Sequence, residues 1–244
     1  CLYSKDLFDI NTNEAADSQK IRIRASYEFS TKAYIPVYMI KQETLDYLIE
    51  EGNKGPVRNQ YNIFLYNNIQ DENLDETDGI ASSVYTRGPI KLMLRGISSQ
   101  PYTEEGPLGQ GSYYTMDIKI DDLIEWTGNL KEIKGLSIYI PEEIEINSDK
   151  FEYSGDEENF KVYYAKDSLI KELNEICKSK DKKILDFIDE DCWRRGAITT
   201  GIEFSINDAP EELSKTFIRA KLNYIFNDEK QDTITFLNSE KWKR

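Results

Sequence analysis

The stretch KIRIRASYEF, residues 20–29, alternates apolar residues with polar or charged ones. Its apolar positions are every second residue, namely Ile21, Ile23, Ala25, Tyr27 and Phe29. Successive side chains of a β-strand point to opposite faces, so this period of two is typical of a strand with one buried face. The sequence therefore predicts a half-buried strand here and a fold in which sheet dominates.

Strand patterns continue along most of the chain. Residues 33–40 (AYIPVYMI) predict a second strand, which Pro36 places at a sheet edge or a bulge because proline lacks the N–H that a ladder needs. Further strands are predicted over residues 60–66, 80–86, 89–95, 113–120, 135–140, 143–146, 160–165 and 197–205. A closing hairpin is predicted to follow, with one arm over 218–226, a turn over 227–231 and a return arm over 233–237.

Helical patterns are fewer. Residues 42–51 predict a short amphipathic helix, and residues 167–178 and 182–192 predict a helical pair. The first member of the pair collects its apolar residues on one face, namely Leu169, Ile170, Leu173, Ile176 and Cys177. The predicted fold class is α+β, predominantly antiparallel β-sheet with a few short helices. We expect a flexible tether over residues 1–19 and a single α+β domain over residues 20–244.

Cys177 and Cys192 allow two interpretations. A disulfide between them would close a loop of about 15 residues and stabilise the fold by about 3 kcal/mol. In a straight helical hairpin, however, the two thiols lie at different levels, since ten helical residues span roughly 15 Å and a disulfide needs Cα atoms within about 7 Å. The alternative is two buried, unbonded thiols, a common state for free cysteine.

The charge balance restricts the partners. The chain has 244 residues with 31 Lys plus Arg, 45 Asp plus Glu and no histidine, a net charge of −14. The lack of histidine excludes every catalytic system that uses an imidazole base and every imidazole metal site. Nucleic-acid binding requires basic side chains that displace phosphate counterions, so we expect no nucleic-acid partner, and any protein partner is expected to be neutral or basic.

One basic cluster departs from this background. Trp193, Arg194 and Arg195 combine an aromatic ring with two guanidinium groups, the composition of many interface hot spots, and are candidate partner-binding residues. The alternative is that Trp193 completes the core while the arginines pair with the acidic residues at 189–191.

Two acidic clusters carry weaker signals. Asp71, Asn73, Asp75 and Thr77 have the alternating spacing of a calcium loop, but Glu76 stands where the turn requires glycine, so a solvated acidic loop is the favoured interpretation and no metal site is predicted. Asp121 and Asp122 lie close to Trp126, either as a carbohydrate-binding acid pair or as the cap of a short helix. No phosphate-binding, nucleophile-elbow or CxxC motif is present, so no cofactor and no enzymatic activity are expected.

Cys1 is the candidate lipid-attachment residue. A cysteine followed by a polar segment is typical of mature bacterial lipoproteins, in which the cysteine carries diacylglycerol with palmitate-type acyl chains. The sequence has no apolar run of roughly 18 residues, so lipid on Cys1 would be its membrane attachment.

The combination of Cys1, a polar tether and an Ile-, Lys- and Asn-rich composition resembles the exported lipoproteins of Borrelia-type spirochaetes. Within that family, residues 23–29 (IRASYEF) and 34–47 are similar to the S-two antigen group. The resemblance implies a lipid anchor, an outer-membrane or cell-surface location with the periplasmic face as the other option, and a role as an antigen at the host interface.

These observations lead to two functional expectations. The first is a non-enzymatic, lipid-anchored envelope protein that binds a host, matrix or envelope protein through its loops. The alternative is a carbohydrate-binding or carbohydrate-active protein that uses tryptophan and tyrosine with paired carboxylates.

Overall fold

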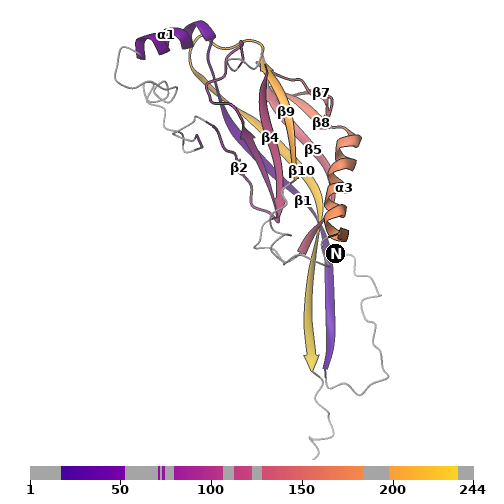
Figure 1. Cartoon of the computed structure of the whole chain (residues 1–244). Coiled ribbons are helices and arrows are strands. Elements are labelled where there is room, and N and C mark those ends of the chain that lie inside the picture. Colours follow the sequence, from indigo (N-terminus) through magenta and orange to yellow (C-terminus); the bar gives the residue numbers. More distant parts are fainter. Residues whose placement is uncertain are drawn as a thin grey trace, which may run out of the picture.

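The computed structural model describes residues 18–52, 71, 73–74, 80–106, 113–122, 128–183 and 198–235. Two antiparallel sheets make up most of this part (Figure 1). The six-stranded sheet has the order β2-β1-β10-β5-β8-β7, built from β1 Ser18–Met39, β2 Val84–Tyr85, β5 Gly128–Pro141, β7 Phe151–Glu157, β8 Phe160–Ala165 and β10 Ser214–Thr235. The four-stranded sheet has the order β3-β4-β9-β6, built from β3 Ile90–Gly96, β4 Tyr114–Asp122, β6 Ile144–Ile146 and β9 Ile198–Ile206.

Two helices accompany the sheets in the described residues, α1 Gln42–Gly52 and α3 Asp167–Lys183. Predominantly antiparallel sheet with few helices is therefore confirmed. The first helix of the predicted pair is present and runs five residues further than expected, with Leu169 and Leu173 buried against the core. The remainder of the second predicted helix, like the strand predicted over residues 60–66, lies outside the described residues, so the helical pair and the finer α+β class stay predictions.

Both long strands differ from the sequence prediction. Residues 20–29 and 33–40 belong to one strand, β1, which begins at Ser18 inside the predicted tether. The hairpin turn predicted over residues 227–231 is wrong, because β10 runs straight through it, with Asn227 opposite Ser26 and Gln231 opposite Arg22. Asn and Asp favour turns, but a continuous partner strand supplies ladder hydrogen bonds that override this local preference.

The core lies between the two sheets. Its residues from the six-stranded sheet include Ala33, Ile35, Val37, Ile138, Ile218 and Leu222, and those from the four-stranded sheet include Ile90, Leu92, Ile118 and Ile202, all at most 2% exposed. Complete burial of a side chain of this size contributes roughly 1.5–3 kcal/mol. The alternation of buried and exposed residues along β1 and β10 therefore fixes which face of the long strands looks inward.

One buried polar cluster connects the sheets. The hydroxyl of Thr31 donates to the carbonyl oxygen of Ile90 at 3.0 Å, and the backbone N–H of Ile90 donates to the hydroxyl of Tyr224 at 3.3 Å. The hydroxyls of Thr31 and Tyr224 are 3.1 Å apart. Each polar group in this apolar region therefore has a partner, as burial demands.

Two amide side chains complete the ladder where strands lack a neighbour. The fully buried Gln100 donates to the carbonyl oxygen of Pro36 at 3.0 Å and accepts the N–H of Tyr38 at 2.7 Å. On α3, the amide of Asn174 accepts the N–H of Ile133 at 2.8 Å and donates to its carbonyl oxygen at 2.9 Å. Proline lacks a backbone N–H and is tolerated here because, among the described residues, the side of β1 away from β10 meets the amide of Gln100 at Pro36 and not a paired strand.

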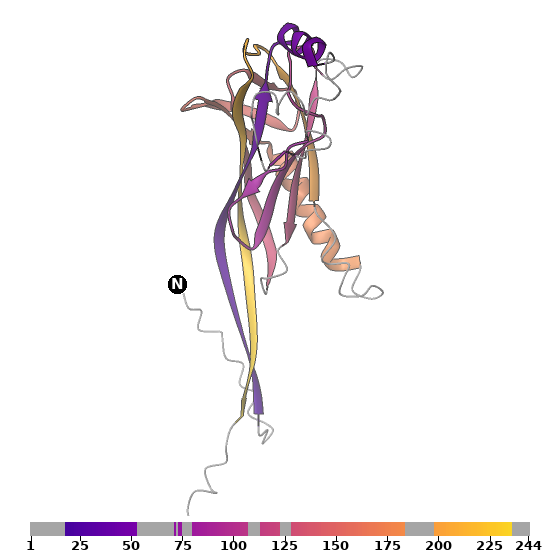
Figure 2. The same cartoon turned by 90° about the vertical axis from the view of Figure 1, so that its left-hand side faces the viewer.

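Residues 18–24 of β1 and 229–235 of β10 lie past the last pairing of β10 with β5 and extend beyond the rest of the described structure as a two-stranded ribbon (Figure 2). Ser18 lies opposite Thr235, so both strands end at one tip. Helix α1 lies at the opposite end of the molecule (Figures 1 and 2). The chain therefore enters and leaves the described structure at the same tip.

Candidate functional site

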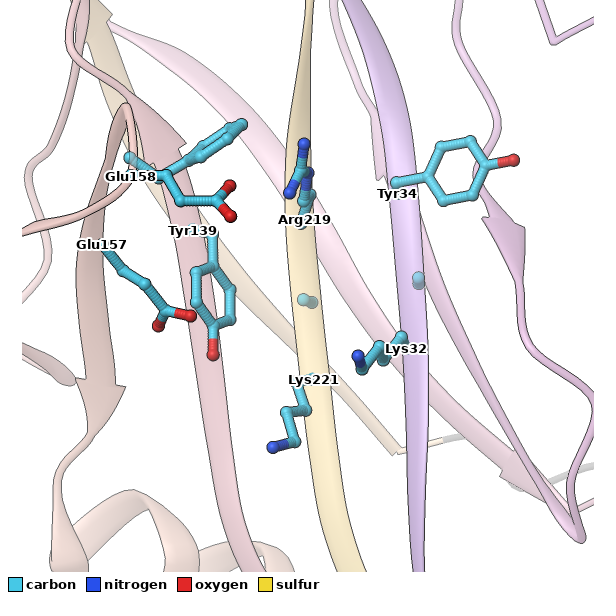
Figure 3. Close-up of a pocket in the computed structure, with 10 residues that line it drawn as sticks. Lys32, Tyr34, Tyr139, Glu157, Glu158, Arg219 and Lys221 are labelled. Carbon is cyan, nitrogen blue, oxygen red and sulfur yellow. The ribbon is translucent and has the colours of Figure 1, made fainter.

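The four-stranded sheet covers one face of the six-stranded sheet, and side chains on the other face, here called the outer face, reach solvent. Tyr34 of β1 lies directly opposite Arg219 of β10, which in turn lies opposite Tyr139 of β5. Tyr34 is 43% exposed and Arg219 is exposed as well. These three strands therefore present a cation between two phenol rings on an open surface (Figure 3).

Two lysines extend the cationic character of this face. Lys32 lies directly opposite Lys221. This pair is two residues along each strand from Tyr34 and Arg219, and so on the same face of the sheet. Like charges that lie directly opposite each other on neighbouring strands destabilise a sheet. In the part of the chain that the structure describes, neither lysine nor Arg219 forms an ion pair. The pair of lysines is therefore locally destabilising, and no ion pair among the described residues offsets it.

Arg219 is held by an aromatic ring. Its guanidinium carbon lies 4.1 Å from the centre of the Phe160 ring of β8. An arginine over an aromatic face keeps its N–H groups at the rim of the ring, free to bond in the plane of the guanidinium. The stacking fixes the cation in position without satisfying its donors.

Two carboxylates approach the same place from the turn between β7 and β8. Glu157 and Glu158 line the cavity with Arg219, and Figure 3 shows the carboxylate of Glu158 on the side of Arg219. Glu158 has a φ of 56°, in the left-handed region that non-glycine residues seldom adopt. This φ belongs to the two-residue turn at 158–159 that joins β7 to β8, since tight hairpin turns need a positive φ at their first position.

These side chains surround a shallow cavity of about 360 Å³. A neighbouring cavity of about 510 Å³ shares Glu158, Phe160 and Arg219 with it and continues toward Thr216. The first cavity is lined by Lys32, Tyr34, Tyr139, Glu157, Glu158, Phe160, Arg219 and Lys221 together with backbone of β1 and β10. We call this set the outer-face site.

A second polar cluster lies further along the same strands, at the end near α1. Asp71 accepts hydrogen bonds from the Tyr38 hydroxyl at 2.8 Å, from Lys215 Nζ at 2.6 Å, and from the backbone and side-chain nitrogens of Asn73 at 3.0 Å each. Burial raises the pKa of Asp71, but the hydrogen bonds from Lys215, Asn73 and Tyr38 outweigh it and lower the pKa to about 2. The carboxylate is saturated by protein donors, so this cluster is structural.

The residues proposed from sequence fall elsewhere. Cys1, Cys192, Trp193, Arg194 and Arg195 lie outside the described residues. Cys177 belongs to α3, and its side chain is likewise outside them. Their roles in lipid attachment, in a disulfide and in partner binding stay predictions.

The acidic clusters have separate outcomes. Asp121 and Asp122 end β4, where Asp121 lies opposite Lys91 and Asp122 opposite Ile90, while Trp126 and the short helix that they were predicted to cap lie outside the described residues, so both interpretations of this acid pair stay predictions. Of the calcium-like loop, Asp71 and Asn73 are described and bond to each other. No group of three or more acidic or cysteine residues suited to a metal ion occurs among the residues with described positions.

The sequence did contain a signal for the outer-face site. Lys215, Phe217, Arg219 and Lys221 alternate with the core residues of β10, and all four face away from the core. Three cations in a period of two are unusual in a chain of charge −14. Their connection with Tyr34 and Phe160, however, depends on strand order, which periodicity does not give.

Comparison of the chain with protein-family models, with curated proteins and with solved structures finds no match. In the described residues, neither helix is long and apolar enough to cross a membrane.

Proposed function

We propose that the protein is a non-enzymatic binding protein of a bacterial cell envelope that engages a carboxylate-bearing partner protein at the outer-face site. The observation that carries this proposal is the set of three cations, Lys32, Arg219 and Lys221, which gather on an open sheet face with no carboxylate within ion-pair distance among the described residues. The proposal therefore assigns binding to the face of a sheet, whereas the sequence led us to expect loops.

The local charge differs from the net charge. At physiological salt the Debye length is about 8 Å, so a small group at the site interacts mainly with the charges that line it, which are the three cations and the carboxylates of Glu157 and Glu158, and less with distant acidic residues. A carboxylate side chain or a chain terminus fits a planar guanidinium donor flanked by two ammonium groups. The partner's contact residue is therefore acidic, even though the whole surface favours neutral or basic proteins.

Long polyanions are a different case. A DNA duplex or a sulfated glycan would extend past the three cations onto a surface whose total charge is −14. Glu157 and Glu158 at the rim of the site add to this repulsion. The proposal therefore retains the absence of a nucleic-acid partner.

The envelope location rests on the sequence resemblance, with lipid on Cys1 as the membrane attachment. The Cys1→Ser protein is expected in the soluble fraction of cells that make it. Its retention in membranes after a high-salt wash would contradict lipid attachment and would leave the binding proposal unaffected.

A carbohydrate ligand is the second candidate. Tyr34, Tyr139 and Phe160 offer rings, and Glu157 and Glu158 offer acceptors for sugar hydroxyls. Glycoside hydrolysis needs two carboxyl groups on opposite sides of the scissile bond. Glu157 and Glu158 are consecutive residues on one side of the cavity, so this candidate is limited to binding.

Titration of the full chain with an end-capped tri-glutamate peptide, followed by amide NMR shifts, tests the proposal. We expect saturable shifts at Lys32, Arg219, Lys221 and Phe160 with a Kd of about 1 mM, equal to roughly −4 kcal/mol. Arg219→Gln is expected to abolish them, whereas the control Lys119→Gln, an exposed strand lysine of β4, leaves them unchanged. Absence of saturable shifts in the wild-type chain contradicts the proposal, and saturation by neutral oligosaccharides alone favours the second candidate.

A further inference from the structure

The second cavity, of about 510 Å³, has a lining of the opposite charge to the first. Three of its lining residues are carboxylates and one is a cation, namely Glu142, Glu143, Glu158 and Arg219. In the first cavity, three cations outnumber two carboxylates. The charge of the lining therefore changes from net positive to net negative between two cavities that share Arg219 and Glu158. We call the second cavity the acidic cavity.

The turn that carries Glu142 and Glu143 is held through its backbone. Nζ of Lys161, on β8, donates to the carbonyl oxygens of Glu142 at 2.7 Å and of Ile144 at 3.3 Å. The N–H of Asn207 donates to the carbonyl oxygen of Glu143 at 2.8 Å. These bonds fix the turn between β5 and β6, while both side chains stay exposed. In the part of the chain that the structure describes, neither carboxylate forms an ion pair.

The acidic cavity suits the long side chain of a basic residue. Its carboxylates belong to two different turns, 142–143 between β5 and β6 and Glu158 between β7 and β8. An ammonium or guanidinium group at the end of a flexible stem reaches acceptors that two separate turns present. Phe160 also lines this cavity and supplies apolar surface against which such a stem packs.

Strand β10 contributes to both cavities and gives their separation. Arg219 lines both cavities, and Thr216 lines the acidic one. At about 3.4 Å per residue of antiparallel strand, Arg219 and Thr216 are roughly 10 Å apart. In an extended peptide, residues two apart project to the same side about 7 Å from each other, and a lysine stem covers the remaining length. A segment with a carboxylate at Arg219 and a cation two residues away therefore reaches both cavities.

We propose that the partner segment at the outer-face site carries a cation two residues from its carboxylate, and that the acidic cavity binds this cation. The inference rests on the proposed function, because it adds a second contact to the carboxylate assigned to Arg219. A purely acidic segment would bring its next charges toward Glu142 and Glu143, which repel them. A segment of mixed charge meets an opposite charge in each cavity.

Matched peptides test the cation contact on the full chain. End-capped Glu-Glu-Glu-Ala-Lys is titrated beside Glu-Glu-Glu-Ala-Gln, and the reversed sequences Lys-Ala-Glu-Glu-Glu and Gln-Ala-Glu-Glu-Glu cover the opposite chain direction. We expect the lysine peptide of at least one direction to bind about two- to fivefold more tightly than its glutamine match, as an exposed ion pair allows. Its amide NMR shifts are expected to include residues 142–143, which the glutamine peptide leaves unchanged.

Two double variants separate the acidic cavity from the overall charge. Glu142→Gln/Glu143→Gln removes two carboxylates of the cavity, and the control Glu172→Gln/Glu203→Gln removes two exposed carboxylates on α3 and β9. Both change the net charge equally, so a general attraction of lysine to the acidic surface would respond to both alike. We expect the first variant to bind the matched peptides equally and the control to keep the preference for lysine.

The outcomes distinguish this inference from the proposed function. Equal binding of the matched peptides in both directions, with tri-glutamate still bound, overturns the cation contact and leaves carboxylate binding at the outer-face site intact. A preference for lysine that persists in Glu142→Gln/Glu143→Gln also overturns it, because the cation then binds another surface. Absence of binding by tri-glutamate and by all four extended peptides contradicts the proposed function and this inference together.

Discussion

The hydroxyl of Tyr38 donates to Oδ2 of Asp71 at 2.8 Å and joins the end of β1 near α1 to a residue that precedes β3 in sequence. Tyr38 is 1% exposed, and the side chain of Asp71 is 3% exposed. Lys215 lies over the Tyr38 ring, 5.5 Å from its centre, and donates to the same carboxylate. A buried carboxylate therefore fixes the segment at residues 71–74 to β1 and β10.

This relationship predicts a pH dependence. The folded pKa of Asp71, about 2, lies below the unfolded value of roughly 3.9, so its stabilisation is present above pH 4 and is lost as the pH falls toward 2. At about 1.36 kcal/mol for each pKa unit, a shift from roughly 3.9 to about 2 contributes about 2–3 kcal/mol. Asp71→Asn is expected to lower the free energy of unfolding at pH 7 by that amount and to flatten its dependence between pH 4 and pH 2.

The chain supplies a matched control for this prediction. Asp156 accepts the hydroxyl of Tyr153 at the same 2.8 Å, but both residues are exposed on the edge strand β7. Asp156→Asn is expected to change stability by less than about 0.5 kcal/mol, as surface substitutions usually do. Equal losses of unfolding free energy for the two variants in urea would show that the burial of Asp71 does not contribute to stability.

A second prediction concerns Gln100. Gln100→Ala would leave the N–H of Tyr38 and the carbonyl of Pro36 buried without partners, at about 1–3 kcal/mol for each group. We expect a loss of roughly 2–5 kcal/mol in urea unfolding at pH 7, while Gln42→Ala, which removes an exposed side-chain bond to Asp46, is nearly neutral. A loss under about 1 kcal/mol for Gln100→Ala would mean that another group takes over the bonds.

A third prediction contrasts two glycines of β5. A Cβ on Gly128 would lie 2.2 Å from the carbonyl oxygen of Asn227, and its φ of 149° disfavours any L-residue. A Cβ on Gly135 would meet nothing within 4 Å. Gly128→Ala is expected to destabilise by at least about 1 kcal/mol, whereas Gly135→Ala is neutral or stabilises by up to about 1 kcal/mol. A lower melting temperature for Gly135→Ala than for Gly128→Ala would contradict the close approach of Gly128 to Asn227 at the start of β5.

A fourth prediction concerns polyanions. Heparin and duplex DNA are expected not to bind the full chain at about 150 mM salt, because the site is small and the net charge is −14. Fluorescence anisotropy with labelled polymers measures this. Micromolar or tighter binding that weakens in Arg219→Gln would show that the outer-face site accepts extended polyanions.

Much of the sheet content could be predicted because the burial period is local. The strand predicted over 113–120 follows that period and is present as β4, which begins at Tyr114, and the strand predicted over 160–165 is present as β8. The turn expected at 227–231 is absent because it depends on a partner, β1, that lies two hundred residues away in sequence. The turn propensity of Asn227 describes the segment in isolation, whereas its pairing with Ser26 of β1 makes it part of a strand.

The outer-face site needs information of the same long-range kind. Arg219 and Lys221 were visible as polar positions of a strand, yet their neighbours Lys32 and Phe160 come from β1 and β8. Gln100 is a further example, since a polar residue in a loop gave no indication that it would be fully buried against β1. Strand order, which no local pattern contains, brings these residues together.

Lys221→Gln tests directly whether the cations of the outer-face site bind carboxylates, because stability and binding are measured on the same variant. Removing one of two lysines that lie opposite each other is expected to raise the free energy of unfolding by roughly 0.2–1 kcal/mol. The same change should weaken tri-glutamate binding several-fold, while Lys119→Gln alters neither quantity. We expect a Lys221→Gln protein that is more stable and binds tri-glutamate more weakly. A Lys221→Gln protein that binds the peptide as tightly as the wild-type chain would contradict carboxylate binding at the outer-face site.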